Sequence, residues 1–380
     1  MKKRLLRHAS SLSCMLLAAA IAGCTARPAT AAPPRVAASE KAKKTAPPPP
    51  QDPDGPITAA QRGETIEILL RVLGESYVFP EKATQAEAAI RARLKRGEYD
   101  AIRTGHALAA ALTKHLNEVL HDAHFGVRYS AEKLPVRVKR DKPSADEIAS
   151  SAVLERQYNG GFEKVERLPG NIGYIEVRSF AFPRRGYDAA VAAMAFVADT
   201  DALIIDIRRN GGGEPDMVAA LSSYFFAEPV HLNDLYWRAG DTTRQYWTLP
   251  GVPGERYVDR EIFVLIGKHT GSAAEEFAYN LKQLKRATLI GEGTWGGANP
   301  GEVFHLGDHF GAFIPTGRAI NPISKTNWEG TGVTPDIEAP ADDALRIAQL
   351  KLISKRITAA KDPELKRALE QRLKELSKAP

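Results

Sequence analysis

The stretch that decides the fold reads Glu261-Ile-Phe-Val-Leu-Ile-Gly-Lys-His-Thr-Gly-Ser-Ala-Ala-Glu-Glu-Phe-Ala-Tyr-Asn280. Residues 262–266 are all apolar, which predicts a short buried strand. From Ser272 onward the apolar residues recur every three or four positions, which predicts a helix. Ser272 therefore lies at a strand-to-helix corner, beside the N–H groups of a helix start. Such a corner suits a nucleophile that creates an oxyanion, although a plain helix cap completed by Glu275 explains the same residues.

Strands and helices alternate on both sides of this corner, which predicts an α/β layered core over residues 166–341. We expect strands at 162–168, 172–177, 202–207, 288–291, 303–306 and 310–314, and helices at 187–198 and 217–226. Three amphipathic helices are expected in a module of residues 57–130, followed by a polar connector at 131–165. A helical segment at 342–380 closes the chain.

The first 23 residues predict a lipoprotein signal peptide. Four basic residues precede an apolar run that is too short to span a membrane, and the run ends in Ile21-Ala-Gly-Cys24. This ending resembles a bacterial lipoprotein box, which implies cleavage before Cys24 and lipidation of that cysteine. The alternative is an ordinary secretory signal cut near Ala26. Residues 24–56 are rich in Pro and Ala and predict an extended tether.

The cysteine count, the net charge and the absence of ligand-binding motifs limit the chemistry and the partners that we expect. Cys14 would leave with the signal and Cys24 would carry lipid, so the remaining chain has no disulfide and no cysteine nucleophile. The formal net charge of +6 falls to +2 once the four basic signal residues leave, which is too mild to predict nucleic-acid binding. No phosphate-binding glycine loop and no Cys/His metal spacing occurs, so we predict no cofactor and no metal.

Three further motifs carry side chains or backbone groups suited to catalysis. Asp206-Ile-Arg-Arg-Asn-Gly-Gly-Gly-Glu214 follows the most apolar strand, and its glycine N–H groups can bind an anion. Glu329 stands before a glycine-rich turn, and His124 is a candidate base for a serine nucleophile. Each also has a plain interpretation: a tight turn, a surface acid and a packing histidine. On composition alone other histidines compete as base: His121, His269, His305 and His309.

In this order along the chain, and with Gly291-Glu-Gly-Thr-Trp-Gly-Gly297 between them, the motifs resemble a known group. It is the C-terminal-processing and tricorn-like serine peptidases, which include the interphotoreceptor retinoid-binding domains. The resemblance covers residues 57–345. It implies a crotonase-like core behind a helical module, with Ser272 as nucleophile. It also implies an oxyanion hole built from the N–H groups of Ala273 and Gly212, and substrate contacts from the flanking glycines, Gly211 and Gly213.

The chain departs from the group at three places. Many members carry a lysine base where Gly297 stands, so the histidine branch fits better, with His124 as base and Glu329 as acid. Ala123 stands where tricorn-like members have a serine that links acid and histidine, so the coupling is left open and Asp122 is a substitute. The segment after His124 is too short for an inserted peptide-binding PDZ module.

These observations predict a serine-type endopeptidase or related hydrolase that works through an acyl-enzyme on a peptide or protein substrate. The signal predicts the cell envelope, with Cys24 anchored in the outer membrane and the protein facing the periplasm. Two alternatives stay open: a non-catalytic binder of apolar ligands or peptides, and a hydrolase of non-peptide esters. A histidine base of ordinary pKa predicts that activity falls below about pH 6.5. The oligomeric state is not predicted.

Overall fold

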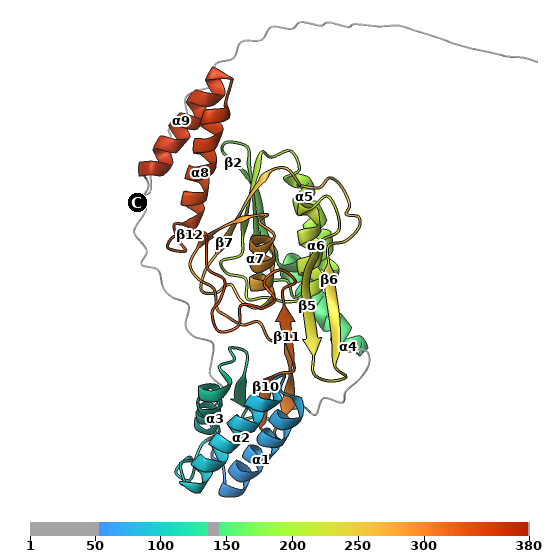
Figure 1. Cartoon of the computed structure of the whole chain (residues 1–380), viewed down its shortest axis with the longest axis vertical. Coiled ribbons are helices and arrows are strands. Elements are labelled where there is room, and N and C mark those ends of the chain that lie inside the picture. The colour runs from blue at the N-terminus through green and yellow to red at the C-terminus, as the bar shows by residue number, and fades with distance from the viewer. Residues whose placement is uncertain (1–52, 136–143, 379–380) are drawn as a thin grey trace, which may run out of the picture. The chain divides into compact units, whose positions relative to one another are not determined.

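The computed structural model describes residues 53–135 and 144–378 (Figure 1). The predicted signal peptide, Cys24 and residues 24–52 of the predicted tether lie outside these residues. Within the part of the chain that is described, no helix is both long and apolar enough to cross a membrane.

A six-stranded sheet forms the centre of the α/β part, in the order β12-β8-β7-β4-β3-β2. β2 and β3 form the predicted antiparallel hairpin, and the strands from β3 to β12 run parallel. β3 and β4 are buried along their whole length because both faces of the sheet are covered. The strands are β2 (Phe162–Leu168), β3 (Ile172–Val177), β4 (Ala202–Asp206), β7 (Glu261–Ile266), β8 (Thr288–Gly291) and β12 (Ile337–Glu338).

Helices cover both faces of this sheet, which confirms the predicted α/β layering (Figure 1). One face packs against α5 (Pro183–Phe196), α6 (Pro215–Ser222) and α7 (Ala273–Gln283). The other face packs against α8 (Ala344–Ala359) and α9 (Pro363–Lys378), the closing helices. α7 is the next element after β7 and follows it by a short loop, so the Ser272 corner lies at the carboxyl edge of the parallel strands.

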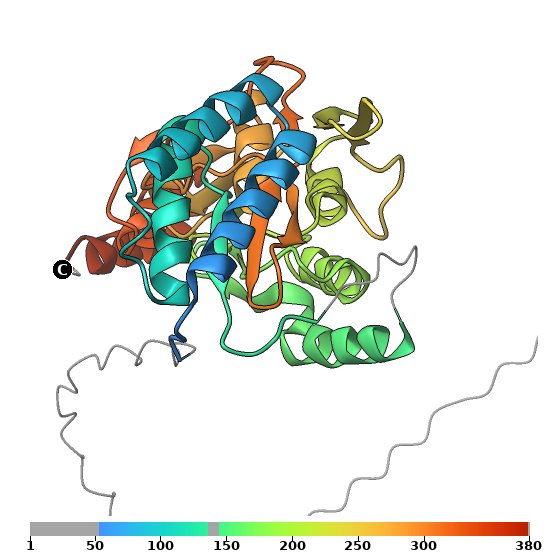
Figure 2. The same cartoon turned by 90° about the horizontal axis from the view of Figure 1, so that it is seen from below.

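The three predicted N-terminal helices are present as α1 (Ala59–Ser76), α2 (Pro80–Lys95) and α3 (Gly105–Leu120). They bury their apolar faces against a three-stranded antiparallel sheet in the order β1-β10-β9 (Figure 2). Its strands are β1 (Gly126–Tyr129), β9 (Gly301–His305) and β10 (Phe310–Pro315). Because β9 and β10 follow β8 in the chain, this shared core ties the α3–β1 loop to the segment that leaves the central sheet after β8.

Several elements escaped prediction. α4 (Ala145–Gln157) and the short helical turn η1 (Asn159–Gly161) lie in the segment expected to be a polar connector. A second antiparallel sheet, in the order β11-β5-β6, has no strong apolar alternation: β6 is almost entirely exposed and mostly polar. Its strands are β5 (His231–Trp237), β6 (Thr242–Trp247) and β11 (Gly317–Ile320), and η2 (Ser223–Phe225) extends α6.

Candidate active site

Ser272 occupies the predicted corner, with an unusual backbone. Its φ of 53° and ψ of −121° are rare for a residue with a Cβ and store strain of order 1–3 kcal/mol. Its N–H donates to Oε2 of Glu275 at 2.8 Å, which confirms the Glu275 side of the predicted capping pair. The corner therefore holds a partly exposed hydroxyl on a backbone that its surroundings force into place.

The glycine turn after β4 packs directly against this corner. A Cβ added to Gly212 would lie 2.8 Å from Ser272 Cβ and 3.1 Å from the nitrogen of Ala273. Gly213 is equally restricted, since its φ is 144° and a Cβ would overlap the backbone of Phe180. The predicted oxyanion residues thus meet in space because neither glycine carries a side chain.

The N–H groups at this contact differ in their availability. The N–H of Gly212 donates to Oδ1 of Asn210 at 2.9 Å, so it already has an acceptor. Within the described residues, the N–H groups of Ala273 and Gly213 make no hydrogen bond. Asn210 is completely buried, and its role could not be predicted because the sequence shows only a polar residue before three glycines.

His124 lies in the loop between α3 and β1, partly buried and close to two aromatic rings. Trp295 meets it edge-on, with ring centroids 4.7 Å apart, and Phe313 lies 5.8 Å away. Burial lowers the pKa of His124 to about 4, so the imidazole is neutral at pH 7. The expected ordinary histidine pKa is therefore wrong for this site. Its Nδ1 is buried without a partner, and within the described chain no hydrogen bond joins the ring to Ser272.

Glu329 is held by three backbone donors from two segments. Oε1 accepts the N–H of Ala123 at 2.8 Å, and Oε2 accepts those of Ala298 and Asn299 at 2.6 and 3.1 Å. Burial, and then the negative charge of Asp122, raise the pKa of Glu329 to about 7 in spite of these donors. The acid is thus tied to the His124 loop through the Ala123 backbone, so no serine side chain is needed at that position.

Asp122 supports the same loop. Its carboxylate is buried and accepts hydrogen bonds from Tyr77 Oη at 3.1 Å, Asn299 Nδ2 at 2.9 Å and the backbone N–H of His124 at 3.2 Å. Burial raises the pKa of Asp122. One ligand atom each from Asp122, His124 and Glu329 lie within 4.8 Å of one another, a spacing a metal ion could use. Each of the two carboxylates already accepts three N–H or O–H donors, which fits a hydrogen-bonded acid network better than a cation site.

Glu275 links the Ser272 corner to residues 294–297. Besides the Ser272 N–H, the buried carboxylate accepts the Thr294 hydroxyl at 2.5 Å and the N–H groups of Gly296 and Gly297 at 2.6 and 3.0 Å. Burial raises the pKa of Glu275 despite these bonds. The capping pattern gave a signal for one of these four contacts; the other three depend on a loop some twenty residues away.

Gly297 stands where lysine-using members place their base. A Cβ there would lie 2.7 Å from His124 Cε1 and would overlap Cζ3 of Trp295. The carbonyl of Gly297 accepts the indole N–H of buried Trp328 at 2.8 Å. The space that a lysine side chain would need is therefore filled by the imidazole and the Trp295 ring.

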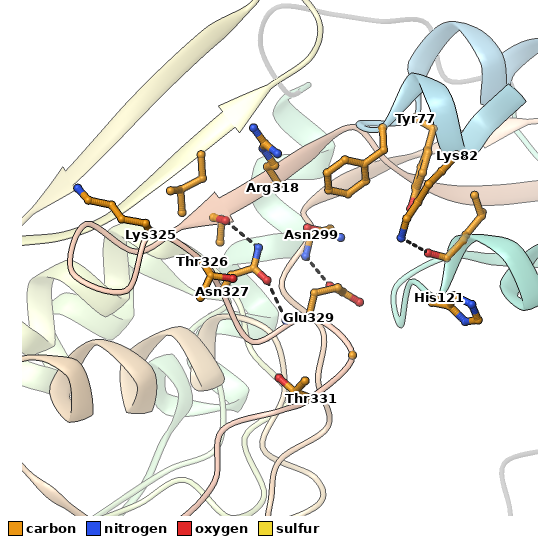
Figure 3. Close-up of a pocket in the computed structure, with 15 residues that line it drawn as sticks. Tyr77, Lys82, His121, Asn299, Arg318, Lys325, Thr326, Asn327, Glu329 and Thr331 are labelled. Atoms are coloured by element: carbon orange, nitrogen blue, oxygen red, sulfur yellow. Dashed lines mark hydrogen bonds between the residues drawn. The ribbon is translucent and has the colours of Figure 1, made fainter. Parts of the chain in front are cut away.

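A cavity of about 530 Å³ opens on the other side of Glu329 (Figure 3). It is lined from α2, β11 and the turn before Glu329, and Figure 3 shows Lys82 turned to the carbonyl of Leu120, to which it donates at 2.8 Å. Ser272 and His124 do not line this cavity. It therefore adjoins the acid without being the place where an acyl group would meet the nucleophile.

Comparisons with known proteins found two matching family models and several similar proteins. Residues 171–339 match the family model described as Peptidase family S41, and residues 58–159 match that of its N-terminal domain in eukaryotic IRBP. The carboxy-terminal-processing protease of Bartonella bacilliformis is 27% identical over 175 residues, or 45% of this chain and 39% of the relative. The tricorn protease of Thermoplasma volcanium is 28% identical over 223 residues, or 56% and 18%. The chain thus spans well under half the length of these curated relatives.

A crystal structure of a peptidase candidate from Parabacteroides merdae has a similar fold. Its TM-score is 0.53 at 20% identity, covering 73% of this chain and 90% of that one. At this identity the likeness concerns the fold alone. It agrees with a mixed α/β arrangement that has helical segments at both ends.

Proposed function

Because this chain belongs to peptidase family S41, we propose that it is a serine peptidase whose nucleophile is Ser272. One observation carries the proposal: the strained Ser272 corner and the glycine turn meet so closely that Gly212 has no room for a Cβ. Packing alone does not need a partly exposed serine with positive φ at a helix start. A nucleophile beside free N–H donors does.

The proposed reaction proceeds through an acyl-enzyme. Ser272 Oγ bonds to the carbonyl carbon of the scissile peptide while His124 accepts the hydroxyl proton. The carbonyl oxygen becomes an oxyanion that the N–H of Ala273 stabilises together with one from the glycine turn. That second donor is Gly212, if its N–H leaves Asn210, or Gly213, whose N–H has no acceptor in the described chain. His124 then gives its proton to the leaving amine, and water repeats the sequence to release the acid.

His124 and Glu329 are proposed as base and acid of this reaction. A neutral imidazole at pH 7 is ready to accept a proton. An ionised Glu329, fixed on the Ala123 N–H, would stabilise the imidazolium that forms. The crowding around Gly297 supports this assignment because it leaves no room for a lysine base.

The wider assignments are proposals of the same kind. We propose that residues 166–341 form a crotonase-like core after a helical module at 57–130 and a connector at 131–165, with 342–380 closing it. A lipidated Cys24 would anchor the protein to the outer membrane, facing the periplasm, and residues 24–56 would serve as tether. Metabolic labelling with an alkyne fatty acid should mark the native protein, and Cys24→Ser should abolish the mark.

The activity test is covalent labelling by a fluorophosphonate probe. Native protein should be labelled on Ser272, and Ser272→Ala should not be labelled. Incubation with a peptide mixture, followed by mass spectrometry, should then show cleaved peptides only with the native protein. No labelling of the native protein, or equal labelling of the alanine variant, would contradict the proposed function. Labelling with ester turnover but no peptide cleavage would favour a non-peptide hydrolase.

A further inference from the structure

Trp295 joins the two halves of the proposed site. Its indole meets the imidazole of His124 edge-on, with ring centroids 4.7 Å apart and planes at 79°. The same indole lies against the serine corner, since a Cβ on Gly271 would be 3.2 Å from its Cε3. One side chain therefore touches both the segment of the nucleophile and the ring of the base.

The backbone around Trp295 is tied to the nucleophile side, although Thr294 and Gly296 also hydrogen-bond to Val333 and Gly330. The N–H of Trp295 donates to the carbonyl of Thr270 at 3.1 Å, and its neighbours Thr294 and Gly296 both bind Glu275. Thr270 and Glu275 flank Ser272 in the sequence. His124 comes from a different part of the chain, the loop after α3. The indole thus transmits the position of the serine corner to the histidine.

Burial of apolar area does not explain this tryptophan. Trp295 is 47% exposed, whereas Trp328 is 2% exposed and belongs to the main core. A half-exposed indole contributes modestly to stability, because much of its apolar surface stays in water. What the indole does contact is the imidazole, and the Phe313 ring lies 5.8 Å from the same imidazole.

We propose that Trp295 is the positioning residue of His124: its indole edge fixes the imidazole relative to Ser272 and keeps water away from one side of the ring. The inference rests on the proposed function, in which His124 is the base. A misplacement of about 1 Å at a reacting group can cost roughly 100-fold in rate, so loss of this contact is expected to matter.

The test compares Trp295→Ala and Trp295→Phe with a matched control, Trp247→Ala. Trp247 is 46% exposed and also contacts a histidine, stacking on His231 at 4.6 Å, but it lies on β6 outside the site. We expect Trp295→Ala to slow fluorophosphonate labelling about 10- to 100-fold, Trp295→Phe to keep most of the rate, and the control to match the native protein. Equal rates in Trp295→Ala and native protein, or an equal loss in the control, would overturn the inference.

A second readout does not depend on activity. The titration of His124 can be followed by NMR in each variant, with His124→Gln to assign the signal. Water that replaces the indole should raise the pKa of His124 from about 4 toward the ordinary histidine value. The charged groups near this ring are the same in every variant: Asp122 on its own loop, Glu329 on the facing turn, and Lys82 on α2 near Asp122.

The two readouts separate the two claims. If the native protein is not labelled at all, the proposed function fails, and the titration still decides whether Trp295 controls the environment of His124. If the native protein is labelled but the titration and the rate are unchanged in Trp295→Ala, the function stands and the positioning role falls.

Discussion

The substitution Glu329→Gln tests two roles of this acid: holding three backbone N–H groups, and stabilising a positively charged His124. The carboxylate satisfies three backbone N–H donors, those of Ala123, Ala298 and Asn299. Glutamine keeps the shape but replaces one oxygen by an NH₂ group, so at least one buried donor loses its acceptor. An unsatisfied buried donor costs about 1–3 kcal/mol, and we expect the free energy of unfolding to fall by that amount. Chemical denaturation near pH 7 measures it.

The larger effect is expected in the pH dependence of labelling. His124, with a pKa of about 4, is neutral above pH 5, so it does not limit the rate there. Glu329, with a pKa of about 7, becomes ionised only as the pH rises through neutrality, and the ionised form stabilises the imidazolium. The native rate should therefore rise through pH 7 and reach only about a tenth of its plateau at pH 6.

In Glu329→Gln this step near pH 7 should disappear. The rate should be flat from pH 5 to 8 and roughly 10²- to 10⁴-fold below the native plateau, the range of a general acid–base contribution. Glu302→Gln is the matched control, since Glu302 is an exposed glutamate on β9 and should leave the profile unchanged. A native profile that is flat from pH 5 to 8, or a Glu329→Gln variant that keeps the step, would refute the reasoning.

Three other predictions follow from buried groups. Gly297→Ala puts a methyl group 2.7 Å from His124 Cε1 and should cut the labelling rate at least about tenfold in a folded protein, as a displaced base would. Burial raises the pKa of Glu276 from 4.5 to about 8, so between these pH values the acid ionises in the unfolded chain but not in the folded one, and stability falls as the pH rises across that range. Glu276→Gln should therefore narrow the drop in Tm between pH 6 and 9. Arg208→Met leaves the buried carboxylate of Asp206 without its ion-pair partner. Urea melts should show that the free energy of unfolding falls by about 3–5 kcal/mol. A loss under about 1 kcal/mol would show that the ion pair is dispensable.

Much of the fold could be predicted because its signals are local. The run at 202–207 and the run at 262–266 are too apolar to be anything but buried, and the periodicity after Ser272 marks its helix without help from distant residues. β6 gave no such signal because it is exposed and mostly polar, and it exists only through its pairing with β5. α4 was missed because its apolar residues form no clear helical face in the sequence, and several of them stay exposed.

The sequence indicates which residue types could form the candidate site, but it does not indicate the hydrogen bonds that join them. Ser272, His124 and Glu329 could be chosen as candidates because a hydroxyl, an imidazole and a carboxylate are side chains that can take part in catalysis. The link between acid and histidine runs through the N–H of Ala123, and every residue except proline has such a group. Asn210 accepts a hydrogen bond from the N–H of Gly212, and this role could not be predicted either, because its partner is again a backbone group.

The space around Gly297 favours histidine over lysine as the proposed base, in addition to the chemistry of the two side chains. A lysine at position 297 would have to start from a Cβ that already crowds His124 and overlaps Trp295, on a backbone held by Glu275 and Trp328. The four hydrogen bonds to Glu275 keep that backbone from moving aside. The proposed histidine base therefore fits glycine at 297 better than a residue with a side chain. Conversion of the site to a lysine base would require removal of both His124 and the Trp295 indole, so Gly297→Lys alone would crowd the histidine without replacing it.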